Sequence, residues 1–292
     1  MHAYSGRYIY AIVETWKSNN RPKTLGNTGI GGRGDEVYLI EHNDIGAFVS
    51  ASPIAPYQIS RENAMTHERT IEAIMKHYTV LPMQFSMIAD SESSVVALLE
   101  RSYALFKAQL QRLEGKKELG LKGMFPETIF QDVLAKNEAI QKRKAELARR
   151  GNPTQAELIE IGKMVESALN AEKEIYREKI LAELRPIAEE TKVNPTTTDR
   201  MFLNAAFLVT EAQEAEMDKK VSEIADKNEG KFKLKYVGNL PPYNFLRLRI
   251  TLDNTTETAW CLFLMTFCSR RSTWLSALPK RLMNKCNKKQ PM

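Results

Sequence analysis

The chain has few of the residues on which metal and thiol sites are built. Its 292 residues include only three cysteines and four histidines. Cys261, Cys268 and Cys286 are odd in number and irregularly spaced, which argues against a disulfide framework and against a zinc site of the Cys-x-x-Cys type. We therefore expect reduced thiols, no metal and no cofactor.

Long apolar runs are also missing. No stretch of about 18 apolar residues occurs, and the first residues lack the apolar segment of a secretory signal. The composition, 43% hydrophobic and 27% charged, is that of a globular chain long enough for one large or two medium domains. We expect a cytoplasmic protein.

Acidic residues are absent from one region, residues 259–292, which contain seven lysines and arginines. Taking these seven from the 42 basic residues of the chain leaves 35 against 36 acidic ones, so residues 1–258 carry a net charge near −1. The net charge of +6 thus belongs to the tail, and nucleic acid is not an expected partner of the folded body.

The same tail contains an apolar stretch, Ala259–Cys268, that is too short to span a bilayer. Followed by Arg270 and Arg271, it is suited to an interface formed by lipid or by another protein. The alternative is a terminal helix that packs on the second domain and ends in a basic segment. The tail therefore suggests an interface- or membrane-associating scaffold as a second function.

Three strands open the region 1–125. The β-branched and aromatic run Arg7–Val13 favours a strand, and shorter strands are expected at 37–40 and 46–50. Asn43 supplies the turn between the last two. The glycine-rich stretch between the first two strands is expected to be a long loop.

Helical periodicity begins at Ser60, where apolar side chains start to recur at three- and four-residue steps. Ser60 is the expected N-cap. A second helix, capped by Asp90 or Ser91, is predicted to continue to about Leu113, and a strand near 118–124 is expected to close the unit. Residues 1–125 therefore form a predicted α+β domain.

Residues 126–190 are rich in Glu, Lys, Ala and Leu, with one break at Gly151-Asn-Pro153. This predicts two helices in a hairpin. The second would be about 50 Å long, so it either protrudes or packs on another molecule, or folds back over its own chain. Its predicted apolar stripe consists of Ile161, Val165, Ala168, Ile175, Ile180, Leu184 and Ile187.

Residues 191–258 read as a second α+β domain. We expect a buried strand at Met201–Thr210, a helix at Glu211–Asn228, and strands at 231–237 and 243–252. This order is compatible with a ferredoxin-like sheet. The predicted fold is therefore α+β, with two α+β domains, the second ferredoxin-like, joined by a long helical hairpin and followed by the tail 259–292.

Two apparent chemical motifs do not hold in their context. Residues Gly29–Gly34 contain Gly-x-Gly-x-x-Gly, but a dinucleotide site requires a helix at the last glycine, and a strand is predicted there. His67-Glu68 begins like a zinc-protease helix, yet Ile71 stands where the second histidine is needed. We expect a loop and a packed or hydrogen-bonded histidine, and no enzyme.

Four phrases remain, and together they resemble the gas vesicle protein F/L family. They are Arg61, Asn63, His67 and Glu68 in the first helix; the strand Thr79–Phe85 around Pro82; Asn204–Val209; and a turn with Gly238, Pro241, Pro242, Tyr243 and Phe245. Their order and rough spacing match the family pattern from residue 7 to about residue 252.

The chain departs from that pattern at two places. Family members commonly have Arg-Phe-Gly where Gln84-Phe85-Ser86 stands, and a tryptophan where Leu240 precedes the double proline. Gln84 removes a cation from its strand, which weakens any expectation that this position binds an acidic partner.

The resemblance implies a non-enzymatic accessory protein of gas vesicles, the air-filled shells that give aquatic microbes buoyancy. Its implied partners are the major shell protein and other accessory proteins, and its implied role is nucleation of the shell or protection of shell subunits from aggregation. We expect docking at strand ends, or else a purely structural closing of the two sheets by the same phrases. The candidate docking residues are Met83, Phe85, Met87, Leu240, Pro241, Pro242, Tyr243 and Phe245.

Overall fold

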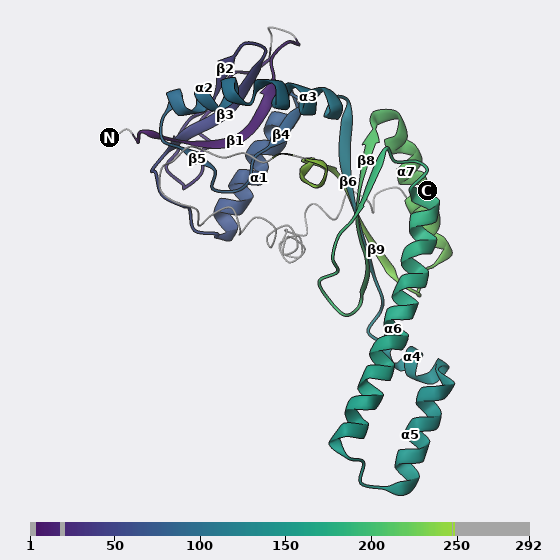
Figure 1. Cartoon of the computed structure of the whole chain (residues 1–292). Helices are drawn as coiled ribbons and strands as arrows, with labels where there is room; N and C mark the ends of the chain where they lie inside the picture. Colours follow the sequence, from purple (N-terminus) through teal and green to yellow (C-terminus); the bar gives the residue numbers. More distant parts are fainter. Residues whose placement is uncertain (1–3, 18–20, 247, 249–292) are drawn as a thin grey trace, which may run out of the picture.

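Two antiparallel sheets organise the chain in this computed structural model, which describes residues 4–17, 21–246 and 248 (Figure 1). In the first sheet the strand order is β2-β3-β1-β4, and β5 also pairs with β1. Its strands are β1 (Gly6–Glu14), β2 (Val37–His42), β3 (Ile45–Ser52), β4 (Val80–Pro82) and β5 (Ile88–Ala89). The strands predicted at 7–13, 37–40 and 46–50 are confirmed.

Both faces of the first sheet are covered. Helix α1 (Arg61–Met75) packs on one face together with Ile30 of the β1–β2 loop, while α2 (Glu92–Arg101) and α3 (Tyr103–Leu113) pack on the other. Almost every residue of β1 is therefore buried, because alternate side chains enter cores on opposite sides. The sheet and its three helices form the first lobe. The single helix predicted from 91 to 113 is in fact two, separated at Ser102.

The second sheet has the strand order β7-β8-β6-β9. Helices α6 (Gln155–Leu184) and α7 (Glu211–Lys227) cover one of its faces and complete the second lobe. Its strands are β6 (Lys116–Met124), β7 (Glu190–Val193), β8 (Met201–Thr210) and β9 (Lys233–Leu240). From β6 to β9 the elements follow as β-α-β-β-α-β, the element order of a ferredoxin-like unit, with the helices between β6 and β7 in the place of the first helix.

Strand β6 was predicted as the last strand of the first domain, and that assignment is wrong. β6 instead lies inside the second sheet, between β8 and β9. The periodicity of residues 118–124 reveals a strand but not its partners, and the partners here begin more than 75 residues later. The first sheet closes with β4 and β5 instead.

A helical hairpin extends away from the second sheet. It consists of α4 (Ile129–Lys136), α5 (Glu138–Arg150) and the N-terminal half of α6, and Figure 1 shows α5 and this half projecting beyond both lobes. The predicted break at residues 151–153 is confirmed, but an additional break at Asn137 divides the first helix, since the Asn137 side chain caps α5.

The predicted apolar stripe of α6 is fully buried only at its C-terminal end, and Ile161, Val165 and Ala168 are half-buried. Ile180, Leu184 and the following Ile187 are buried against the second sheet, whereas Ile175 is 62% exposed. In the projecting part of α6, which has no sheet behind it, Leu158 and Ile159 are more than half exposed.

The segment after β9 is also not as predicted. Residues Tyr243–Phe245 form the 3-10 turn η1 rather than the start of a strand. The amide groups of Tyr243 and Phe245 donate to the carbonyls of Pro241 and Pro242, at 2.7 and 3.2 Å, which closes the turn. Of the rest of that predicted strand, only residues 246 and 248 are described, and neither belongs to a strand; the tail 259–292 lies outside the described residues. Among the helices that the structure describes, none combines the length and apolarity needed to cross a membrane.

Candidate functional site

Three of the four family phrases meet at His67, a buried residue of α1. Its Nδ1 lies 2.9 Å from the hydroxyl of Tyr8, and its Nε2 lies 3.0 Å from the hydroxyl of Tyr243 and 3.2 Å from the carbonyl oxygen of Met83. One imidazole thus joins the first helix, the segment after Pro82 and the double-proline turn. The prediction that His67 is a hydrogen-bonded helix residue is confirmed.

The donors around His67 can be assigned from their neighbours. The amide of Ser86 donates to the Tyr8 hydroxyl at 2.9 Å, which leaves the Tyr8 proton for Nδ1 of His67. Nε2 then carries the imidazole proton and faces the oxygens of Tyr243 and Met83. This arrangement suits a neutral imidazole. Burial raises the pKa of Tyr8 well above its usual value, so its hydroxyl stays protonated.

The described neighbours of this histidine are not metal-ligating side chains. The groups at its two nitrogens include two tyrosine hydroxyls and a backbone carbonyl, and aromatic rings of Tyr10 and Phe85 pack against it. Within the described part of the chain, no group of three or more His, Cys, Asp or Glu side chains is arranged to hold a metal ion. The geometry at His67 is that of a structural joint.

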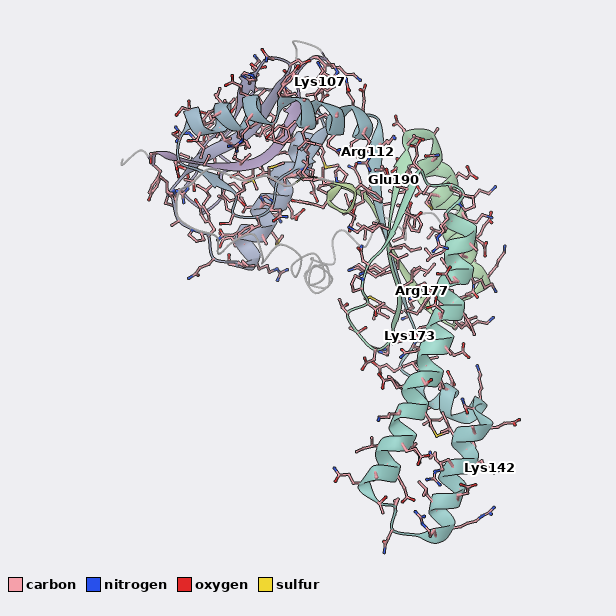
Figure 2. All side chains as sticks on the ribbon, viewed as in Figure 1. Lys107, Arg112, Lys142, Lys173, Arg177 and Glu190 are labelled. Atoms are coloured by element: carbon pink, nitrogen blue, oxygen red, sulfur yellow. The ribbon has the colours of Figure 1, made fainter. Side chains whose placement is uncertain are left out.

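A buried carboxylate holds the same turn from the second lobe. Glu118 of β6 is 3% exposed and accepts from both the backbone amide and the side-chain amide of Asn244, at 2.9 and 2.6 Å. Arg112 of α3 donates to the carbonyl of Phe245 at 2.9 Å and pairs with Glu190 of β7 at 2.6 Å (Figure 2). The turn is therefore tied to both sheets at once.

Apolar packing completes this joint, which we call the junction: residues Leu240–Phe245 with His67, Arg112 and Glu118. Phe245 is 4% exposed and enters the core beneath β1, α2 and α3, alongside Ala206 and Leu208 of β8. Pro241 and Pro242 are buried too. Leu240 packs on Gly120, where an added Cβ would approach its side chain to 3.1 Å. The junction therefore fixes one lobe against the other.

The predicted docking residues are thus divided between interior and rim. Four of them are buried: Met83, Pro241, Pro242 and Phe245. Four are half-buried: Phe85, Met87, Leu240 and Tyr243. Phe85 and Tyr243 both flank His67, so these two lie close together on the rim. The interior four match the alternative in which the phrases hold the sheets together.

The other family positions support local structure. Asn63 donates its side-chain amide to the carbonyl of Gln58 at 3.1 Å, next to the Ser60 cap of α1. Arg61 is exposed in the first turn of α1, and Glu68 is half-buried beside His67. Pro82 is the last residue of β4 and lies opposite Ala11 of β1. The end of an edge strand suits proline, because its nitrogen has no hydrogen to donate to a neighbouring strand.

Two family positions lie apart from His67, in the second sheet. Asn204 does not reach the junction; it donates to the carbonyl of Pro195 at 2.8 Å and so holds the β7–β8 loop. Gly238, in β9, has ordinary van der Waals space toward Leu119.

Sequence reasoning missed the polar residues that secure the junction, Arg112, Glu118 and Asn244. No local signal marks them, because each looks like an ordinary surface residue in its own element. Ser86 did carry a signal, since it stands where the family commonly has glycine. Its φ of 68° is in the left-handed region that favours glycine, and its hydroxyl accepts from the amide of Tyr57 at 3.0 Å.

Comparison with known proteins agrees with this architecture. The family model described as gas vesicle synthesis protein GvpL/GvpF matches residues 6–247. Gas vesicle protein F of Nostoc sp. is 28% identical over 259 residues, covering 84% of this chain and 99% of that protein, and gas vesicle protein F of Dolichospermum flosaquae is 27% identical, covering 82% and 97%.

A solved structure shows the same fold. The crystal structure of the gas vesicle protein GvpF from Anabaena sp. superposes with a TM-score of 0.72 at 25% identity, covering 84% of this chain and 99% of that one. The family model, which spans most of the chain, and this shared fold lead to one conclusion: the chain belongs to the GvpL/GvpF family of gas vesicle proteins.

Proposed function

We propose that this protein is a non-enzymatic accessory factor of gas vesicles that binds the major shell protein and assists its nucleation or prevents its aggregation. The observation that carries the proposal is the family match over residues 6–247. A shell subunit must present an apolar face to gas, and free subunits would aggregate through that face. A partner that covers part of the face before assembly meets this need.

The rim of the junction is the proposed contact surface. Phe85 and Tyr243 are half-buried side chains on a rigid layer formed by His67, Met83 and Tyr8. Leu240 is a further half-buried apolar residue of the junction, whereas Met87, also half-buried, packs against the core on the α2–α3 face of the first sheet and is not part of this surface. Partly exposed aromatic and aliphatic side chains on a rigid base suit recognition of an apolar segment, because little side-chain entropy is lost on binding.

The test is co-purification of a tagged form of this chain with a small, apolar shell protein expressed in the same cells. The rim variant carries Phe85→Gln and Leu240→Gln. The matched control carries Leu158→Gln and Ile159→Gln on α6, where both side chains are more than half exposed and far from the junction. We expect the rim variant to recover at least about fivefold less shell protein, and the control to match the parent.

Three results decide between the alternatives. Equal recovery by the rim variant and the parent would show that the junction phrases are structural only. Failure of the parent chain to recover any shell protein would refute the proposed function. Detection of the protein in the floating vesicle fraction would support the proposed location, in the cytoplasm and on gas vesicles.

A further inference from the structure

The projecting part of α6 carries large apolar side chains that are open to water. Leu158 is 55% exposed and Ile159 is 52% exposed. Gly162 follows them one turn later along the helix, and Lys163 and Glu166 are exposed beside it. We call these five residues the open face of the hairpin.

The open face points away from α5. Arg143 of α5 pairs with Glu157 and Glu160 of α6, at 3.8 and 2.7 Å, which marks the side of α6 that is turned toward α5. Because a helix has about 3.6 residues per turn, Gly162 and Glu166 lie on the opposite side of α6. The hairpin therefore cannot bury its own open face.

The same side of α6 is buried further along the helix. Leu169 and Tyr176 follow Gly162 at seven-residue steps, and both pack in the core of the second lobe. Figure 1 shows that α6 runs past the end of the second sheet into the hairpin. The open face is thus the continuation of a packing face beyond the sheet that covers it.

Gly162 is an unusual residue at this place in the helix. Within the described part of the chain, a Cβ added at Gly162 would meet no atom within 4 Å, and the backbone there is not left-handed. Glycine inside a helix destabilises it relative to alanine. The missing side chain does, however, allow the backbone of a second helix to come close. Gly162 therefore suits the crossing point of two helices.

The charges of the open face complement one another. Neither Lys163 nor Glu166 forms an ion pair with another described residue. When two copies of this helix lie antiparallel and cross at Gly162, Lys163 of each copy comes within reach of Glu166 of the other, and two-fold symmetry makes the contact twice. The two charges cancel, so the face does not select a strongly acidic or strongly basic partner.

We propose that the open face pairs antiparallel with the open face of a second copy of this chain, with Gly162 at the crossing. Leu158 and Ile159 of each copy are then covered by the other copy. The hairpin projects beyond both lobes, so the lobes of the two copies lie at opposite ends of the joined hairpins (Figure 1). The tail 259–292 matches the face less well, because it carries seven cations and no acidic residue. The inference does not depend on the proposed shell contact, which lies at the junction.

Sedimentation velocity of the full chain over a range of concentrations tests the proposal, and we expect a reversible equilibrium between monomer and dimer. The test variant is Leu158→Gln with Ile159→Gln. The matched control is Ile54→Gln with Ile59→Gln in the loop before α1, where the side chains are 55% and 48% exposed. We expect the test variant to raise the Kd of the dimer at least about tenfold and the control to leave it within about twofold.

Two further variants test the geometry of the pairing. Gly162→Leu should increase the hydrogen-exchange protection of the surrounding amides in the monomer, because leucine favours a helix, and yet weaken the dimer, because its side chain separates the two helices. Lys163→Glu should weaken the dimer by placing carboxylates opposite each other. Adding Glu166→Lys to that variant should restore association. Unchanged association of Gly162→Leu, or no rescue by the double charge exchange, would contradict the antiparallel crossing.

Other outcomes would overturn the proposal. A parent chain that is monomeric at every concentration has no self-association surface. Dimers that form only when the chain is ended at Thr258 would show that the tail occupies the open face instead. Loss of shell protein by the Leu158→Gln, Ile159→Gln variant in the co-purification described above would assign the face to the shell protein, whereas a loss confined to the rim variant leaves the two surfaces separate.

Discussion

The junction and the hairpin are stabilised in opposite ways. At the junction, Glu118 reaches Asn244 across 126 residues of sequence, and His67 reaches Tyr243 across 176. In the hairpin, the polar contacts are short in range and exposed to water, such as Arg143 with Glu160 at 2.7 Å. The junction therefore depends on the whole fold, and the hairpin depends largely on its own sequence.

This difference has an energetic consequence. A buried donor or acceptor that loses its partner keeps the full penalty of desolvation, whereas an exposed ion pair that is broken is replaced by water. Substitutions at the junction should therefore loosen the attachment of the lobes, while those in the hairpin should leave global stability almost unchanged. Four substitutions test the contrast.

The largest effect is expected for Phe245→Ala. This change removes a 4% exposed ring from a core shared by both lobes and leaves a cavity, so the free energy of unfolding should fall by about 3–5 kcal/mol. Urea denaturation followed by circular dichroism measures it. Phe130→Ala, in α4, is the control, because that ring is 37% exposed and should contribute about 1 kcal/mol. Equal losses would contradict the contrast.

Glu118→Ala should come next. It removes both acceptors of Asn244 from a buried site, and we expect a loss of about 2–3 kcal/mol in the same unfolding measurement. Glu118→Gln retains one acceptor and should lose less. A loss below about 1 kcal/mol for the alanine variant would mean that water replaces the carboxylate and that the junction is wetter than its burial indicates.

A smaller effect is expected at Ser86. Ser86→Ala leaves the amide of Tyr57 without its acceptor and should lower the free energy of unfolding by about 1 kcal/mol. Ser86→Gly loses the same hydrogen bond but relaxes the left-handed backbone at φ 68°, so it should be the more stable of the two. The reverse order in thermal unfolding would show that the backbone is not strained there.

The smallest effect concerns acid titration of the hairpin. Ion pairing with Arg150 and hydrogen bonds from Thr154 lower the pKa of Glu157 to about 2, from an ordinary value of 4.5. Because the folded pKa is depressed, this contact is fully present above about pH 4.5 and is lost as the pH falls toward 2. Arg150→Gln should raise the pKa of Glu157, as followed by NMR of its side-chain carboxyl. An unchanged pKa would assign the shift to the Thr154 cap alone.

The same contrast explains what could be predicted. The helix break at 151–153 and the Ser60 cap could be predicted, and Ser91 was one of two predicted caps, because caps and breaks act within a few residues. The strand at 118–124 was also predicted, but the sheet to which it belongs could not be, since any of several strands could have paired with it. For His67, the sequence excluded zinc chemistry but did not supply Tyr8 and Tyr243 as its neighbours.

The docking residues show the same limit to prediction from the sequence. The family phrases were found from their order along the chain, and residues 6–247 match the family model. Their burial was not predictable, because a turn with apolar and aromatic residues has the same sequence pattern whether it is exposed or packed between two sheets. Met83, Pro241, Pro242 and Phe245 are in the interior, and Phe85, Met87, Leu240 and Tyr243 are half-buried.

The sequence by itself determined most of the elements, the helical hairpin and the family, because periodicity, caps and motif order are local properties of the chain. Only the tertiary structure decided that β6 belongs to the second sheet and that η1 is held between His67 and Glu118. Those outcomes depend on which distant segments pack together, and that choice is made by the combined free energy of the whole fold.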